Sequence, residues 1–276
     1  MDLTTLQGIS GALHQRLPRL GGADGALVLM YHAFGAPGEA ASRYVVPRRR
    51  FAQQMAYLLN ARYHVISVAE LVRRYQANEP LPARSVAITI DDGYLDNLTV
   101  AYQVLRRQGF PATIFAVSGA LGGCNNWDPD GTLAGRPLLS LPNLQAMQRG
   151  GIEIGAHTRT HPALTTLGPE RLRDEVEGSR ADLERGLGVP VATFSYPHGR
   201  YNAAVAAAVA RAGYLAGFTV EEGVNTLDTD RYALRRIEVF GTDTLPTFAL
   251  KLWRGRSRLF YQRRPRRRAF TPAVNG

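Results

Sequence analysis

Two short polar motifs, far apart in the chain, carry residue types that can do chemistry together. The first reads Thr89-Ile90-Asp91-Asp92-Gly93, and the second reads His157-Thr158-Arg159-Thr160-His161. Two imidazoles and one carboxylate can hold a divalent metal ion and leave one coordination position open, while the second carboxylate serves as a base. Together the motifs therefore predict a metal-dependent hydrolase.

Each motif also has an ordinary structural interpretation. Asp-Asp-Gly is common in tight turns, because Asp tolerates turn geometry and Gly supplies a positive φ. Two histidines four residues apart are common on helix surfaces, where they are neighbours without being ligands. The position of the motifs along the predicted fold decides between these interpretations.

Four apolar runs rich in β-branched residues each end directly before a polar cluster. The runs cover residues 26–30, 86–90, 152–156 and 191–195, and the clusters begin at Tyr31, Asp91, His157 and Tyr196. In a parallel βα arrangement the carboxyl ends of all strands open onto one face. We therefore expect the four clusters to converge, whereas chance placement would scatter them.

Helices and strands alternate through the rest of the chain. We expect helices over 51–59, 68–75, 97–108, 142–149, 172–187 and 202–212, and further strands over 111–117, 214–220 and 233–240. Such alternation in one domain, residues 25–245, indicates an α/β fold, a distorted or incomplete (β/α) barrel of about seven parallel strands. The alternative is an open doubly wound sheet, which also places ligands at the carboxyl ends of strands.

The motifs resemble those of the polysaccharide deacetylases with a NodB-homology domain, carbohydrate esterase family 4, over residues 27 to 250. That family has a distorted (β/α) barrel and removes N-acetyl groups from amino sugars. The resemblance implies that Asp91 is the catalytic base. It also implies that Asp92, His157 and His161 bind one divalent metal ion, with zinc the first expectation and cobalt or nickel as alternatives.

The family's third motif, Arg-x-Pro-Tyr, is altered here to Ser195-Tyr196-Pro197-His198. The resemblance implies that Tyr196, Pro197 and the backbone N–H of His198 bind the oxyanion or the substrate. Ser195 cannot replace the arginine that orients the base in the family. Arg235 or Arg236 can supply it, and alternation along the strand at 233–240 favours Arg236, although both are also plausible surface residues.

The general acid is expected at an unusual place. The family's usual acid is a histidine in a late Leu-x-His motif, and no histidine follows His198 in this chain. The sequence is more similar to the branch of poly-N-acetylglucosamine deacetylases, in which an early Tyr-His provides the acid. The corresponding residues are Tyr31-His32, so the resemblance implies that His32 is catalytic, with a structural histidine at a strand end as the alternative.

Several aromatic residues can form a sugar-binding platform, because rings pack well on the C–H faces of sugars. The candidates are Tyr94, Trp127, Tyr196 and Tyr201, and burial in the core is the alternative for each. We expect Asp96 and Asn97 to cap the helix that follows them rather than to contact substrate.

Composition and charge bear on compartment and partners. The formal net charge is +10, and Cys124 is the single cysteine, so no disulfide can form within one chain. Residues 1–24 lack a basic leader pattern, and no apolar run is long enough to span a bilayer. We therefore expect a cytoplasmic protein.

Residues 246–276 are basic and amphipathic. This pattern favours peripheral contact with an anionic membrane over nucleic-acid binding, with a solvated tail as the alternative.

These observations predict an enzyme that removes N-acetyl groups from an amino-sugar polysaccharide or a lipid-linked glycan precursor. One alternative is an inactive glycan-binding module of the same fold, because the motif arginine is missing. A non-haem iron oxygenase also uses two histidines and a carboxylate, but it would leave Asp91 without a role. The sequence leaves the glycan, the linkage and the oligomeric state open.

Overall fold

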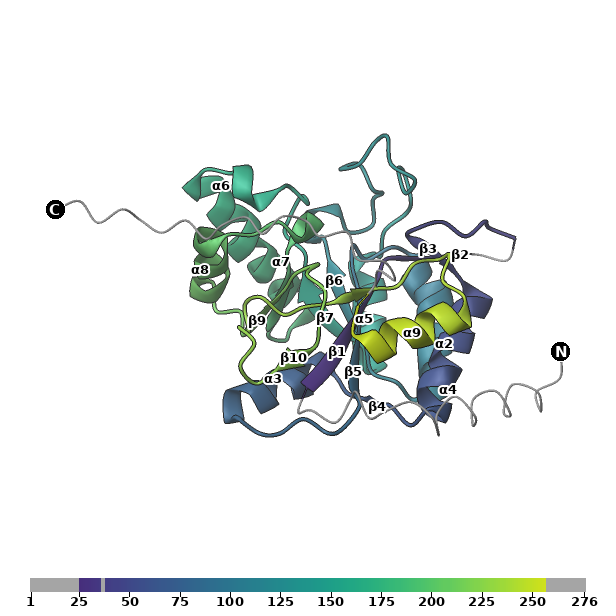
Figure 1. The fold of residues 1–276 in the computed structure, drawn as a ribbon. Coiled ribbons are helices and arrows are strands. Elements are labelled where there is room, and N and C mark those ends of the chain that lie inside the picture. The colour runs from purple at the N-terminus through teal and green to yellow at the C-terminus, as the bar shows by residue number, and fades with distance from the viewer. Residues whose placement is uncertain (1–24, 36–37, 257–276) are drawn as a thin grey trace.

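A curled sheet of short strands forms the centre of the computed structural model, which describes residues 25–35 and 38–256 (Figure 1). Its strands are β1 (Gly25–Tyr31), β4 (His64–Val65), β5 (Ser85–Ile90), β6 (Thr113–Ala116), β7 (Glu153–Ala156), β8 (Thr193–Ser195), β9 (Ala216–Phe218), β10 (Asn225–Thr226) and β11 (Ile237–Glu238). Two further strands, β2 (Ala33–Gly35) and β3 (Val45–Pro47), pair with each other in parallel. The sheet provides the strand ends on which the polar clusters depend.

The sheet runs in the order β10-β1-β5-β6-β7-β8-β9, and only β10 is antiparallel to its neighbour. Residues 234–238 lie between β9, at one end of this order, and β1, next to the other end. Leu234 bridges to Phe218 of β9, and Ile237 pairs with Leu29 of β1. This closure confirms the distorted (β/α) barrel and excludes the open doubly wound sheet.

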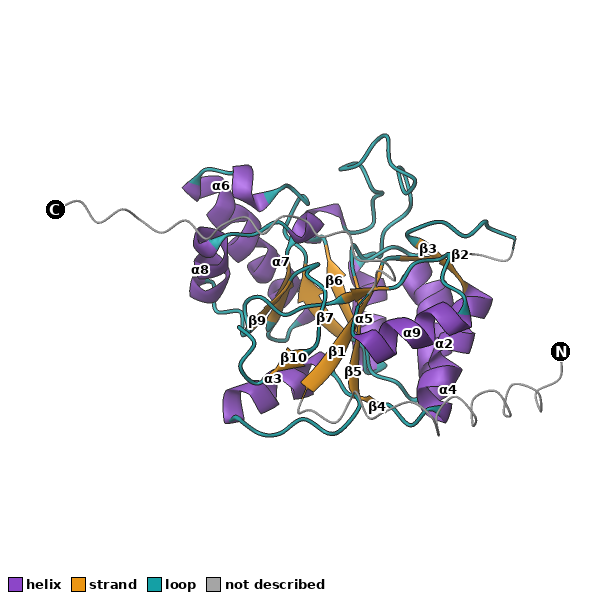
Figure 2. Ribbon diagram, viewed as in Figure 1, coloured by secondary structure: helices purple, strands orange, loops and turns teal. Residues whose placement is uncertain are grey.

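Helices surround the sheet (Figure 2). They are α2 (Arg48–Asn60), α3 (Val68–Ala77), α4 (Tyr102–Gln108), α5 (Leu141–Arg149), α6 (Pro169–Arg173), α7 (Ser179–Leu187), α8 (Ala203–Arg211) and α9 (Leu245–Arg254). Two π-helical turns, η1 (Asn97–Ala101) and η4 (Asp174–Gly178), and three 3₁₀ turns, η2 (Ser118–Ala120), η3 (Leu164–Thr166) and η5 (Pro197–Gly199), complete the elements. The Ser67 side chain caps α3 by accepting from the Glu70 N–H, and Gly109 ends α4 in the left-handed conformation.

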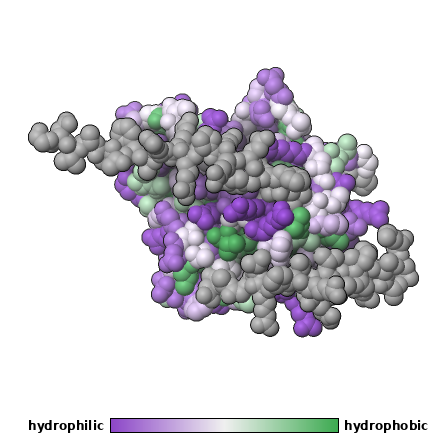
Figure 3. Space-filling model, viewed as in Figure 1, coloured by the Kyte–Doolittle hydropathy of each residue, from purple (hydrophilic) through white to green (hydrophobic). Residues whose placement is uncertain are grey.

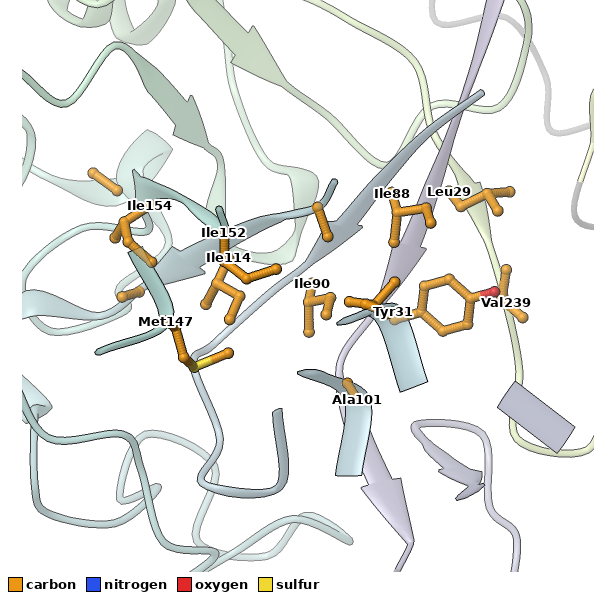
Figure 4. Close-up of a cluster of buried hydrophobic side chains, with 14 of the residues drawn as sticks. Leu29, Tyr31, Ile88, Ile90, Ala101, Ile114, Met147, Ile152, Ile154 and Val239 are labelled. Atoms are coloured by element: carbon orange, nitrogen blue, oxygen red, sulfur yellow. The ribbon is translucent and has the colours of Figure 1, made fainter. Parts of the chain in front are cut away.

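Alternation along the strands builds the core on both faces of the sheet. Figure 4 shows Leu29 and Tyr31 of β1 beside Ile88 and Ile90 of β5, and all four side chains are at most 1% exposed. Ala26 and Val28 of β1 and Ala87 of β5, which alternate with those residues, belong to a second apolar cluster that includes residues of α3. Burial on both faces fixes the register, because a shift by one residue would exchange the two sets.

Part of the segment predicted as a basic tail is a helix of the domain. Phe248 and Leu252 of α9 are buried in the main core, where Phe248 meets Tyr57 of α2 edge to face. These two side chains are therefore unavailable to a membrane surface. Residues 257–276, which hold most of the basic run, and residues 1–24 lie outside the described part of the chain.

Within residues 25–35 and 38–256, no helix combines the length and apolar character needed to cross a bilayer. On the visible part of the face in Figure 3, hydrophobic residues form small areas separated by hydrophilic ones.

Candidate metal centre and active site

Two adjacent carboxylates stand at the carboxyl end of β5. Asp91 and Asp92 are 3% and 6% exposed. The Asp91 N–H donates to the Tyr31 carbonyl oxygen (2.9 Å), which extends the β1–β5 pairing to this residue. Asp92 has a φ of +73° and is followed by Gly93 at +76°. This turn directs the two carboxylates to different partners.

The two histidines of the second motif face Asp92 from the end of β7. The Nε2 atoms of His157 and His161 each lie 3.4 Å from the same Asp92 oxygen, Oδ1. The other ring nitrogen of His157, Nδ1, is 2.7 Å from the Ser195 carbonyl oxygen. Because a carbonyl only accepts, Nδ1 carries a hydrogen, so that loss of the second ring proton frees the Nε2 lone pair for a metal ion.

These three side chains fit a divalent metal ion. One ligand atom from each of Asp92, His157 and His161 lies within 4.8 Å of the others, and all three residues are buried. Two imidazole nitrogens and one carboxylate oxygen are the donor set of catalytic zinc sites that keep one position open. The carbonyl behind His157 is the kind of outer partner that orients such ligands.

The local electrostatics also suit a cation. Burial works to raise the pKa of Asp92, but hydrogen bonds from both histidines hold that pKa well below its usual range. For His157, burial works to lower the pKa, while Asp91, Asp92 and the Ser195 carbonyl together raise it. Burial lowers the pKa of His161. The site thus combines an ionised carboxylate with two imidazoles that differ in proton affinity.

Asp91 faces Arg236 instead of the histidines. Arg236 is fully buried, and its Nη1 and Nη2 donate to the two Asp91 oxygens at 2.7 Å each. Nη2 also donates to Ser195 Oγ (2.9 Å) and Nε to the Thr219 carbonyl (2.8 Å). Burial works to raise the pKa of Asp91, but Arg236 and His157 hold it below its usual value. Arg235 is exposed, so the alternation expected along this segment places Arg236 inward.

Ser195 contacts both His157 and the Asp91–Arg236 pair. The sequence did not indicate this role for Ser195. Its carbonyl oxygen holds His157, while its hydroxyl lies 3.3 Å from Asp91 and accepts from Arg236. The small hydroxyl stands where the family motif has arginine, and it leaves room for the guanidinium of Arg236, which arrives from a distant segment.

His32 follows β1 and lies at the edge of the site. His32 works against burial to lower the pKa values of Asp91 and Asp92, but by less than the other side chains do, namely Arg236 and His157 for Asp91 and the two histidines for Asp92. Its backbone carbonyl accepts from Asn97 Nδ2 (2.9 Å), and its ring meets Tyr44 edge to face at 5.1 Å between centroids. Tyr44 had no signal in the sequence, because only the fold brings it to His32.

The aromatic candidates divide by exposure. Trp127 is half-buried, and its ring centroid lies 4.9 Å from that of His161. Tyr94 and Tyr196 are at most 1% exposed, and their hydroxyls bond to Asn125 and to the Tyr232 carbonyl. Neither ring therefore offers a face to a sugar in this structure, whereas the Trp127 ring lies beside His161.

The altered third motif borders the site. His198 is exposed, has a φ of +57° and places its ring 4.7 Å from that of His161. Pro197 beside it is buried. Four of the described non-glycine residues with positive φ are at this site: Asp92, Thr158, His161 and His198. Such backbone costs about 1 to 3 kcal/mol per residue and typically persists where function requires the geometry.

The expectation that Asp96 caps a helix is wrong. Asp96 makes no capping bond; its carboxylate accepts from the Phe34 N–H and from Arg136 Nε, each at 2.6 Å. Arg136 also donates to Glu39 (2.7 Å). Arg136 belongs to the long connection between β6 and α5, which rises above the sheet in Figure 1. Asp96 therefore links Arg136, in the same connection as Trp127, to Phe34 of β2, the strand that follows His32.

Comparison with known proteins agrees with this fold and site. The family model described as "Polysaccharide deacetylase" matches residues 78–217. YxkH of Bacillus subtilis (strain 168), which is named for the same family, is 30% identical over 212 residues, covering 77% of this chain and 70% of the relative. The chain belongs to the polysaccharide deacetylase family, as the motifs indicated.

Two further similarities concern a relative and a solved structure. The poly-beta-1,6-N-acetyl-D-glucosamine N-deacetylase of Staphylococcus aureus (strain MRSA252) is 24% identical over 253 residues, 84% of each chain. The structure of the Streptococcus pyogenes deacetylase PplD in complex with acetate superposes with a TM-score of 0.71 at 26% identity, covering 83% of this chain and 98% of that one.

We predict that zinc binding weakens as the pH falls below neutral. The raised pKa of His157 keeps a proton on its ring that zinc must displace, while Asp92 stays ionised throughout. Competition against a chelating dye between about pH 5.5 and pH 8 measures this. His157→Ala should abolish zinc binding, and His64→Ala, at an exposed position, should not change it. A constant affinity over that range would contradict the assignment.

Proposed function

We propose that this protein is a metal-dependent N-deacetylase that hydrolyses the acetamide groups of an amino-sugar polysaccharide or glycan precursor. The observation that carries the proposal is the division of labour between Asp92, which faces the two histidines, and Asp91, which faces Arg236. This arrangement provides a metal site and a separate base within one buried cluster.

Asp92, His157 and His161 would hold the ion. A divalent ion bound there lowers the pKa of a water molecule and polarises the acetyl carbonyl. Zinc is the first expectation for a site of two imidazoles and one carboxylate, and the identity of the metal is part of the proposal.

Asp91 serves as the general base. The two bonds from Arg236 fix both of its oxygens, and its lowered pKa keeps it ionised and ready to accept a proton at neutral pH. Orientation is the principal contribution of Arg236, because a bidentate guanidinium pair allows a single geometry. Arg236 is thus a positioning residue for the base.

His32 serves as the general acid that protonates the leaving amine, and the backbone N–H of His198 stabilises the oxyanion. The Trp127 ring, beside His161, stacks on the sugar. Asn97 holds the backbone of His32, and Tyr44 limits the orientation of its ring. The proposed acid therefore comes from the end of β1, and the proposed metal ligands come from the ends of β5 and β7.

The inactive glycan-binding module has less support than the enzyme. Its main argument was the missing arginine of the third motif. Arg236 reaches Asp91 from the segment that closes the barrel, so that the base has a guanidinium partner in spite of Ser195. A module that only bound glycan would have no need for this buried arrangement.

We predict that the protein releases acetate from a β-1,6-linked N-acetylglucosamine oligomer in the presence of zinc, and that Asp91→Asn lowers kcat at least about 100-fold. Zinc content should be unchanged, because Asp91 is not a ligand. Circular dichroism must show that the variant folds, since it leaves Arg236 without an anionic partner. Wild-type binding of the oligomer without acetate release would instead support the glycan-binding module.

We also predict that His32→Gln affects substrates according to their leaving group. Amide hydrolysis should fall about 100-fold or more, because the amine cannot leave without a proton. Hydrolysis of 4-nitrophenyl acetate, whose phenolate leaves unaided, should fall far less. His64→Gln, at an exposed position, serves as the control. Equal losses on both substrates would show that His32 does not act as the acid.

A further inference from the structure

The three residues between the ligand histidines form a loop whose backbone is bonded on both sides. The Thr158 and Arg159 carbonyls accept from the N–H groups of Ser118 (3.0 Å) and Gly119 (2.9 Å). The His161 N–H donates to Thr158 Oγ1 (2.9 Å). Since Thr158 and His161 both have positive φ values, 66° and 63°, these bonds hold a conformation that the chain does not favour by itself.

A buried carboxylate completes this network from another element. Glu175, which is 1% exposed, accepts from the N–H groups of Arg159 and Thr160 through Oε2, each at 2.9 Å. Its Oε1 accepts from Thr160 Oγ1 at 2.5 Å. One carboxylate thus satisfies three donors between the two metal ligands, and none of the proposed catalytic steps uses it.

The helix that carries Glu175 is irregular at this point. Residues 169–187 form one helical run, α6, η4 and α7, and Glu175 lies in its π-helical turn η4. Single π-helical turns inside α-helices are frequent at functional sites. The irregular turn brings the Glu175 side chain to the loop between the histidines.

The Arg159 side chain fastens the same loop to the helix. Its Nε and Nη2 donate to Asp182 (2.7 and 3.0 Å), and its Nη1 donates to Asp174 (2.5 Å). Two glycines leave room for Arg159, Gly178 beside its side chain and Gly119 beside its backbone carbonyl. A Cβ on Gly178 would lie 2.6 Å from Arg159 Nε, and one on Gly119 would lie 2.7 Å from the Arg159 carbonyl oxygen.

We infer that Glu175 is a positioning residue for the metal site: it holds the loop that sets the direction of both histidines. The inference rests on the proposed metal binding by Asp92, His157 and His161. Thr158 and His161 have backbone conformations that the chain does not favour by itself, so other contacts must hold the loop in place. Glu175 and the Arg159 contacts do this from the helix.

The test compares zinc affinity in Glu175→Gln and in Glu177→Gln, an exposed position on the same π-helical turn. The glutamine at 175 has the same shape, but it lacks the negative charge that strengthens the bonds from the two N–H groups, and its amide nitrogen can only donate to Thr160 Oγ1. Competition with a chelating dye should give a zinc dissociation constant about 10 to 100 times larger for Glu175→Gln, and an unchanged constant for Glu177→Gln.

A second variant covers the case in which Glu175→Gln does not fold. Thr160→Val removes the hydroxyl bond to Glu175 at an exposed position and leaves both backbone bonds in place. It should weaken zinc binding several-fold, by less than Glu175→Gln. The melting temperatures of the metal-free proteins are measured in parallel.

The outcomes separate the inference from the proposed function. If the wild type binds no zinc, the proposed metal site fails. If the wild type binds zinc and both Glu175→Gln and Thr160→Val bind it with the same affinity, Glu175 has no positioning role. A lower melting temperature with unchanged zinc affinity would mean that Glu175 only stabilises the fold, and would equally overturn the inference.

Discussion

Asp91 and Asp92 are neighbours in the chain, yet they must face different partners. Asp92 lies against two imidazoles, and Asp91 lies against a buried guanidinium. If both carboxylates turned toward the histidines, no base would remain beside the metal site. The positive φ of Asp92 makes the separation possible, because it turns the chain sharply where β5 ends. The remaining features of the site depend on this turn.

Burial of the Asp91–Arg236 ion pair has an energetic cost, because both charged groups lose their contact with water. Asp91 and Arg236 are both almost completely removed from water, and such pairs are weak evidence for stability, because desolvation offsets their attraction. Removing one partner of a buried pair costs about 3 to 5 kcal/mol. The pair is therefore better understood as an arrangement that fixes the orientation of Asp91, the proposed base. Its position follows from the fold, since Arg236 lies in the segment that joins β9 to β1 and closes the barrel.

Much of this organisation could be predicted from the sequence, because the relevant signals are local. Apolar β-branched runs predicted the strands that precede His32, Asp91 and His157. Alternation of side chains along a strand favoured Arg236 over Arg235 as the inward residue. The short strands are harder to predict, because two or three residues cannot show alternation: the segments predicted over 214–220 and 233–240 are longer than β9 and β11, and β2 has no predicted counterpart.

Other features had no local signal. Ser195, Glu175 and Tyr44 gain their roles from partners that only the fold brings together. Asp96 carries a residue type that favours helix caps, but Phe34 and Arg136 engage it instead. The amphipathic pattern after residue 245 favoured contact with a membrane surface, whereas Phe248 and Leu252 of α9 pack in the core. Patterns reveal that a face is apolar, but they do not reveal what covers it.

Crystallography of the zinc-loaded protein, with anomalous scattering at the zinc edge, tests the central claim most directly. The account predicts one strong peak about 2.0 to 2.2 Å from His157 Nε2, His161 Nε2 and an Asp92 oxygen. Asp91 should remain outside the coordination sphere and paired with Arg236. A peak elsewhere, or one with Asp91 as a ligand, would contradict the account.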